Sequence, residues 1–412
     1  MSMEPVKERV MGHLRYLAEE IGCRPIGTDA NDAAAEYIEK VWKNAGLIVE
    51  KQEFEVPNWE CEKACLILKG EQLDARANSF SAACDITGEI MPICTLEELE
   101  ATPHLAGKIV LLYGELSKEN FIPKGFTIYN PESHKRVIQL LEEKNPSAII
   151  TVRMEKMNDE PIFNDWDLDI PSVTISAETG LMINNCSNAA QIRLIVDSKR
   201  SPGKTRNIIG RLNGNAKEKI ILTAHYDSVF KTYGAFDNAS GVSIILALAE
   251  EISTRDDLHM GFEFIAFSSE EYLGLGDQIY LSNFDRTLQD GIAAINFDGI
   301  GQSLGTNNMT LMAGSLGLEN LLKTIKKGFP AVQWVNPWYE SNHYTFFSNG
   351  VPSIPFSCTG VSDLLHTPDD RLKWISPEKM NEVFSIALHV IENLQDKTSE
   401  WTRSADHKVV GT

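Results

Sequence analysis

The sequence lacks three features that would point to other classes of protein. It has no cysteine pair at the C-x-x-C spacing of a metal site, and its seven cysteines are scattered. No apolar run approaches membrane-spanning length, and the segment MSMEPVKERVMGHLRYL has no apolar core of signal-peptide length. Positive charge is not in excess, because 38 Lys and Arg residues face 58 Asp and Glu residues, a formal net charge of -20. These absences argue against nucleic acid or a membrane as the main partner.

The same absences predict a cytoplasmic protein with reduced thiols. Export behind a leader that is missing from this chain is the alternative, and only then would Cys61 and Cys65 be candidates for a disulfide. The oligomeric state is left open by the sequence, a homodimer included.

The chain has 412 residues, 43% of them hydrophobic. The spacing of the apolar residues differs between three parts of the chain. Amphipathic helices are predicted over residues 4–22 and 31–45, followed by a strand near 47–56. Residues 58–197 carry short apolar stretches separated by turns, at 64–68, 90–93, 109–113, 149–152 and 173–175, with a helix near 133–144. This middle region reads as a small β-rich domain with helices.

Helix–strand alternation resumes after a segment SPGKTRN (201–207) that resembles a linker. Strands are predicted at 207–212, 219–224, 262–267, 291–297, 309–313 and 352–356, and helices at 240–253, 276–284, 316–327 and 377–394. Such alternation predicts an α/β fold with a mixed, mostly parallel sheet flanked by helices. If the sheet also includes the first two helices and the first strand, we expect one domain in two parts, 1–57 and 198–412, with 58–197 inserted between them.

The residues with the strongest chemical signal follow apolar stretches of this second part. KIILTAHYD ends on His225 and Asp227, SSEEYLG holds Glu270 and Glu271, INFDG holds Asp298, and LLHTPDD holds His366, while GAFDNASG holds Asp237. Nitrogen and carboxylate ligands from several strand ends of one sheet are what a two-metal hydrolytic centre requires.

Each of these residues alone also has an ordinary structural explanation. An aspartate at a strand end is commonly a helix cap or turn former, and paired glutamates commonly form a solvated first turn. The whole set of two histidines and three or more carboxylates is what favours a metal centre. Of two neighbouring glutamates, one could bind metal while the other accepts a proton from water. Asp227 could accept the second ring N–H of His225.

The series HYD, FDNASG, SEEYLG, NFDG and LLHTPDD resembles the family of two-zinc exopeptidases that includes aminopeptidases Y and S and glutamate carboxypeptidase. The opening GCRPIGTDANDAAAEYI is similar to the N-terminal helix pair of that family. The segments DIPSVTISAETG and NIIGRL resemble the close of its protease-associated domain. The resemblance implies a zinc aminopeptidase fold with such a domain as the insert at 58–197.

The resemblance also implies a role for each matching residue. His225 and Asp298 would bind one zinc ion, Glu271 and His366 the other, and Asp237 would bridge the two. Glu270 would be the general base for a metal-bridged water, and Asp227 would orient His225. Cobalt or manganese could replace one zinc. Several relatives carry a tyrosine where this chain has Leu365, so oxyanion stabilisation passes to Tyr344 or His343 as candidates.

The expected function is removal of N-terminal residues from peptides. A carboxypeptidase must hold a carboxylate, and the segment GIGQSLGTNN (299–308) offers no Arg or Lys for that task. Arg371 is the nearby guanidinium, with Asp369 and Asp370 as its expected partners. A carboxypeptidase of the glutamate carboxypeptidase type and a glutaminyl cyclase-like acyltransferase are the alternatives. A non-enzymatic receptor would require lost ligands, and none is lost.

Overall fold

The computed structural model describes residues 3–126, 130–154, 161–186, 191–256, 258–283, 288–360 and 364–403. The chain divides into two compact units. Unit 1 consists of Met1–Glu55, Lys204–Glu271 and Leu275–Thr412, and unit 2 of Val56–Gly203 with Tyr272–Gly274. Among the described helices, none has the length and hydropathy that crossing a lipid bilayer requires.

Unit 1 is built on a sheet with strand order β13-β12-β14-β11-β9-β10-β8. Its strands are β8 (Gln191–Leu212), β9 (Lys219–His225), β10 (Gly261–Phe267), β11 (Gly291–Phe297), β12 (Thr306–Met309), β13 (Gln333–Trp334) and β14 (Ser353–Thr359). The central strands β14, β11, β9 and β10 run parallel, while β8 and β12 pair antiparallel with their neighbours. The predicted mixed, mostly parallel sheet is confirmed.

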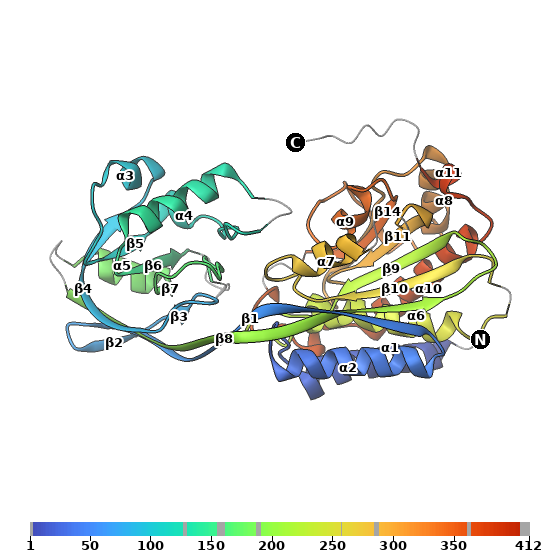
Figure 1. Ribbon diagram of the computed structural model, residues 1–412, viewed down its shortest axis with the longest axis horizontal. Helices are drawn as coiled ribbons and strands as arrows, with labels where there is room; N and C mark the ends of the chain where they lie inside the picture. Colours follow the sequence, from blue (N-terminus) through green and yellow to red (C-terminus); the bar gives the residue numbers. More distant parts are fainter. Residues whose placement is uncertain are drawn as a thin grey trace. The chain divides into compact units, whose positions relative to one another are not determined.

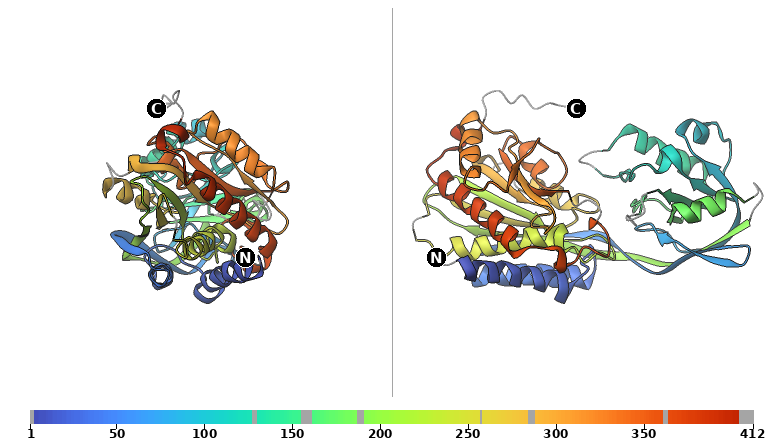
Figure 2. Two further views of the ribbon diagram at one scale, coloured as in Figure 1. Left: turned by 90° about the vertical axis from the view of Figure 1, so that its right-hand side faces the viewer. Right: turned by 180° about the vertical axis from the view of Figure 1, so that it is seen from behind.

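Helices cover both faces of this sheet (Figure 1). They are α1 (Met3–Arg15), α2 (Asp29–Asn44), α6 (Ser240–Ile252), α7 (Leu275–Asn283), α8 (Leu316–Lys326), α9 (His343–Phe347), α10 (Pro377–Leu394) and α11 (Ser399–Thr402). The larger core cluster joins one face of β9 and β10 to α1, α2, α6 and α10, and a smaller cluster joins the other face to α7 and α9. In Figure 2, right, the N-terminal helices (blue) and α10 (red) lie on the same side. Burial on both faces explains the continuous apolar run of β9.

Unit 2 has its own parallel strands and its own core. It contains β2 (Glu71–Asp74), β3 (Arg76–Ala77), β4 (Cys84–Ile93), α3 (Leu96–Ala101), β5 (Lys108–Leu112), α4 (Glu132–Lys144), β6 (Ala148–Arg153), β7 (Ser172–Ser176) and α5 (Ala177–Asn184). β4, β5, β6 and β7 pair in parallel in that order, and the core cluster of α3, α4, β5 and β6 covers one face. Its identification as a protease-associated domain stays a prediction.

Two long strands supply residues to both units, and they correct one sequence prediction. β1 (Ile48–Leu68) runs past the predicted end at 56, and β8 runs without interruption through 201–207. The predicted linker is therefore wrong. Pro202 lies in β8 outside the residues that pair with β4 (191–196) and with β10 (208–212).

One smaller prediction also differs from the structure. The strand predicted at 309–313 is β12, Thr306–Met309, because asparagines that hydropathy does not flag pair with β14. The helix predicted at 276–284 is present as α7, Leu275–Asn283, and its residue 284 lies outside the described residues. No disulfide joins any of the seven cysteines, all of which lie in the described residues.

Candidate metal centre

Three strand ends of unit 1 bring the predicted site residues to one edge of the sheet. β9 ends on His225, β11 ends one residue before Asp298, and β10 ends three residues before Glu270. Because these strands are parallel, their carboxyl ends meet at the same edge, where α/β proteins place their sites.

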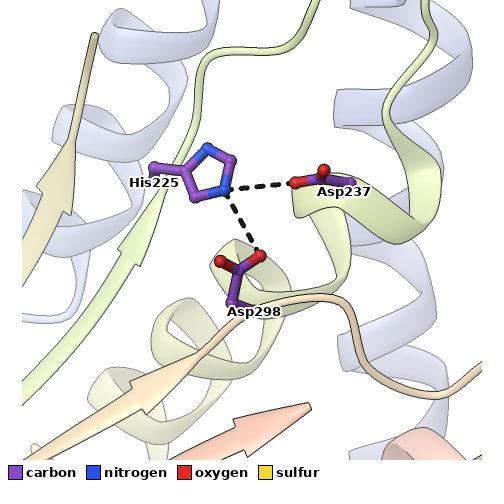
Figure 3. A group of neighbouring side chains, drawn as sticks. All are labelled: His225, Asp237 and Asp298. Carbon is purple, nitrogen blue, oxygen red and sulfur yellow. Dashed lines mark hydrogen bonds and ion pairs between the residues drawn. The ribbon is translucent and has the colours of Figure 1, made fainter. Parts of the chain in front are cut away.

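A first group combines one nitrogen and two carboxylate oxygens. His225 Nε2 lies 3.2 Å from Asp237 Oδ1 and 3.3 Å from Asp298 Oδ1. Figure 3 shows the imidazole edge facing both carboxylates. His225 is 1% exposed, so its ring has been withdrawn from water. The three side chains offer ligand atoms at mutual distances that a metal ion can bridge.

A second group shares Asp237 with the first. His366 Nε2 lies 3.1 Å from Asp237 Oδ2 and 3.1 Å from Glu271 Oε2. The two oxygens of Asp237 thus face the two groups separately, Oδ1 towards His225 and Oδ2 towards His366. One carboxylate that serves two clusters in this way has the position of a bridge.

The main chain around Asp237 is held by another carboxylate that sequence reasoning did not assign to the site. Asp370 is 1% exposed and accepts the N–H groups of Phe236 at 2.7 Å and of Asp237 at 3.0 Å. The peptide bond between Asp237 and Asn238 is cis. Asp370 therefore does not serve as the expected partner of Arg371, which donates to the carbonyl of Pro368 instead.

Asp227 is placed between the histidine and the glutamate pair. Its fully buried carboxylate accepts the N–H of Glu270 at 3.3 Å and of Glu271 at 3.2 Å. His225 Nδ1 lies 3.2 Å from the Asp227 carbonyl oxygen and 3.7 Å from its carboxylate. The shorter contact of the ring is thus to the main chain, while the carboxylate fixes the glutamate loop.

The two glutamates occupy different positions. Glu271 belongs to the second group, whereas Glu270 belongs to neither group and its Oε2 lies 4.0 Å from His225 Nε2. Burial and the neighbouring negative charges of Asp298 and Glu271 raise the pKa of Glu270 well above its usual value. Because Glu270 lies beside the centre without belonging to either group, its position suits a proton acceptor better than a ligand.

The other pKa values follow from crowding of charge in a buried space. Burial opposes the charge of Asp237, but hydrogen bonds from His225 and His366 outweigh it and lower the pKa of Asp237. Burial and the charge of Asp237 raise the pKa of Glu271 to about 7. Carboxylates held this close repel one another unless positive charge is added.

The arrangement passes three tests for zinc. The donors are imidazole nitrogen and carboxylate oxygen, which zinc accepts, and ligand atoms at about 2.0–2.1 Å from a tetrahedral ion lie roughly 3.3 Å apart. The four separations given above, 3.1 to 3.3 Å, agree with that spacing. Glu271 Oε1 is buried without a hydrogen-bond partner among the described residues, which leaves a lone pair available for a cation.

A cavity of about 580 Å³ opens onto both groups. Besides the site residues, its described lining comprises Phe236, Gly299, Trp338, Glu340, Ser341, Ser357, Cys358, Thr359, Gly360 and Leu365. The aromatic and aliphatic members give one apolar region, and Glu340 adds a further negative charge. Sequence reasoning missed Trp338, Glu340 and Cys358, because they come from loop or strand ends with no motif spacing.

Neither oxyanion candidate is among the described residues that line this cavity. His343 is 0% exposed, and its Nε2 lies 2.8 Å from the carbonyl of Trp338. The N–H of Tyr344 is bonded within the loop to Ser341, and its ring packs on Phe347. A role for either residue in oxyanion stabilisation stays a prediction.

Residues 207–391 match the model of peptidase family M28. The match includes every predicted site residue, all of which lie in unit 1. The prediction of a two-zinc exopeptidase relative is thereby confirmed at the level of the family.

Known proteins similar to this chain carry aminopeptidase names. Aminopeptidase YwaD of Bacillus subtilis is 26% identical over 396 residues, 90% of this chain and 80% of that protein. Probable lipoprotein aminopeptidase LpqL of Mycobacterium tuberculosis is 22% identical over 71% of this chain, which spans only 58% of that relative. The crystal structure of BSAP, a zinc aminopeptidase from Bacillus subtilis, superposes with a TM-score of 0.76 at 22% identity, covering 97% of this chain and 98% of that one.

Proposed function

We propose that this chain is a zinc-dependent aminopeptidase that removes N-terminal residues from peptides. The observation that carries the proposal is the pair of possible ligand groups that share Asp237 at one cavity, beside Glu270, which belongs to neither group. The family M28 match and the aminopeptidase names of its relatives support the same reading.

In this proposal each residue has one task. His225 and Asp298 hold one ion, Glu271 and His366 hold the other, and Asp237 holds both. Bound zinc ions would supply Lewis-acid activation of a water molecule and of the peptide carbonyl. Cobalt or manganese in place of one zinc is compatible with the same oxygen and nitrogen donors.

Glu270 moves the proton. Its carboxylate belongs to neither ligand group and lies beside His225, where it can take a proton from the attacking water and keep it until the leaving amine accepts it. Asp227 assists by holding the N–H groups of both glutamates, so that Glu270 and Glu271 keep separate orientations. One side chain thus serves proton transfer while its neighbour serves binding.

Charge at the cavity favours a free amine over a free carboxylate. Glu270, Asp298 and Glu340 line it, and among its described lining residues there is no Lys or Arg. A substrate ammonium gains from these negative charges, whereas a terminal carboxylate would lack the cationic partner that it requires. The apolar lining of Phe236, Trp338 and Leu365 suits a hydrophobic side chain of the substrate.

A substrate panel tests the proposal. We expect Leu-p-nitroanilide to be hydrolysed, and N-acetyl-Leu-p-nitroanilide to be hydrolysed at least ~100-fold more slowly, since acetylation removes the ammonium charge. Hydrolysis should stop with a chelator and return with zinc. Rates are measured by absorbance of the released nitroaniline.

An N-blocked dipeptide with a free C-terminus is the matched control. Preferential cleavage of that compound would contradict the aminopeptidase proposal and favour a carboxypeptidase of the glutamate carboxypeptidase type. Cyclisation of an N-terminal glutamine without hydrolysis of Leu-p-nitroanilide would favour the glutaminyl cyclase-like alternative. Hydrolysis that persists without metal would contradict all three.

A further inference from the structure

A fully buried arginine lies next to the centre. Arg24 stands between α1 and α2 and is 0% exposed, and no step of the proposed mechanism uses it. Its side chain donates to main-chain carbonyls of Tyr226 (2.9 Å), Leu17 (3.2 Å), Gly22 (2.8 Å), Tyr233 (2.7 Å) and Gly234 (2.9 Å). All of these acceptors are carbonyl oxygens, an unusual surrounding for a buried cation, which normally needs a paired carboxylate.

The acceptors are not random in the chain. Tyr226 lies between His225 and Asp227, and Gly234 lies three residues before Asp237. Arg24 therefore donates hydrogen bonds to both ends of the segment that connects His225 with Asp237. Residues 226–234 contain no helix or strand, so this segment has no regular main-chain hydrogen bonds of its own to fix its path.

The main chain of Arg24 also forms hydrogen bonds with this segment. Its N–H donates to Ser228 Oγ at 3.0 Å, and its carbonyl accepts the N–H of Ser228 at 3.3 Å. Ser228 Oγ in turn donates to the carbonyl of Thr232 at 3.1 Å. From the other side, the Arg371 guanidinium stacks on the ring of Tyr233 with its central carbon 3.9 Å from the ring centroid.

The positive charge of Arg24 and its hydrogen bonds have opposite effects on the binding of a metal cation. Burial lowers the pKa of the guanidinium, and the negative charges of Asp370, Asp227 and Asp237 counteract that effect. A positive charge close to these carboxylates repels a metal cation bound to them. Its hydrogen bonds to the carbonyls of Tyr226, Tyr233 and Gly234, in contrast, fix the main chain between His225 and Asp237 and so favour the arrangement that a cation needs.

We propose that Arg24 is a positioning residue of the metal centre, whose planar fork fixes the segment from Tyr226 to Gly234 and thereby the spacing between His225 and Asp237. The inference rests on the metal centre of the proposed function. It assigns Arg24 no contact with substrate or metal. A lysine cannot replace it, because an ammonium cannot direct donors in one plane to carbonyls at both ends of the segment.

The positive charge of Arg24 and its hydrogen bonds predict opposite changes in zinc affinity when Arg24 is replaced. Arg24→Gln removes the positive charge, and by Coulomb interaction alone it should tighten zinc binding. Loss of the hydrogen bonds should weaken zinc binding by roughly 10–100-fold, the usual effect of removing a group that orients ligands. Arg24→Lys keeps the positive charge but loses the planar guanidinium. If Arg24 acts as a positioning residue, zinc binding should be weakened in this variant as well.

The experiment measures zinc affinity of the metal-stripped full-length chain by competition with a fluorescent chelator. Arg9→Gln and Arg9→Lys are matched controls, since Arg9 belongs to the same N-terminal layer but pairs with Glu251 on α6. We expect unchanged affinity in the controls and weaker affinity in both Arg24 variants. As a second readout, kcat at saturating zinc should fall in the Arg24 variants with little change in KM.

Affinity that is unchanged or tighter in a folded Arg24 variant would overturn the inference, with near-ultraviolet circular dichroism as the check of folding. If one Arg24 variant does not fold, the other carries the same test. Should neither fold, Ser228→Ala removes the two hydrogen bonds of Ser228 Oγ, to the Arg24 N–H and to the Thr232 carbonyl, and wild-type affinity in that variant would overturn the inference. A wild-type chain that binds no zinc would instead overturn the proposed metal centre.

Discussion

Glu270→Gln is expected to lower kcat by about 10⁴-fold or more, at the upper end of what one acid–base residue contributes. Glutamine keeps the size and the position of the side chain, but it cannot accept the proton of the attacking water. The same group must also protonate the leaving amine, so both halves of the reaction are lost. KM should change little, because Glu270 belongs to neither ligand group. Steady-state hydrolysis of Leu-p-nitroanilide measures the effect.

Zinc content is the control for this variant. Glu270→Gln should retain the zinc of the wild type, whereas Glu271→Gln, its neighbour in the chain, should lose zinc, because Glu271 lies 3.1 Å from His366. Elemental analysis after dialysis distinguishes the two. Loss of zinc from Glu270→Gln with retention in Glu271→Gln would mean that the roles of the two glutamates are reversed.

Asp237→Ala is expected to abolish stoichiometric zinc binding at both positions. Its two oxygens face His225 and His366 separately, so no other described carboxylate touches both groups in this way. Removal leaves two clusters with one ligand fewer each and with residual negative charge in a buried space. Isothermal titration of the stripped protein with zinc should show no tight binding.

Asp298→Ala is the matched comparison, because Asp298 belongs to the first group only. That variant should lose one zinc ion and retain the ion held by Glu271 and His366. Asp237→Ala with the zinc content of the wild type would exclude a bridging role for Asp237. Equal losses in the two variants would instead mean that the two positions bind zinc as one unit.

Some of the site residues could be predicted from the sequence because they stand at the ends of strands. His225 and Asp298 follow continuous apolar runs, and parallel strands bring such ends together. Asp237 follows no such run, and its inclusion depended on resemblance to a family motif. The geometry adds what spacing cannot give, namely that the two oxygens of Asp237 face different histidines.

Residues that act through tertiary contacts were not accessible in the same way. Arg24 and Asp370 bind main-chain groups more than 100 positions away in the chain, and no local pattern marks such contacts. The predicted linker at 201–207 failed for a related reason. Proline and glycine usually interrupt a strand, but β8 continues through Pro202 and Gly203, and its pairing partners change along its length.

The most direct test of the account is the number of zinc ions bound per active chain. Metal-stripped protein is titrated with zinc, bound metal is determined by elemental analysis, and hydrolysis of Leu-p-nitroanilide is measured at each step. The account predicts that full activity returns as bound zinc approaches two per chain. Full activity with one ion or none per chain would contradict it.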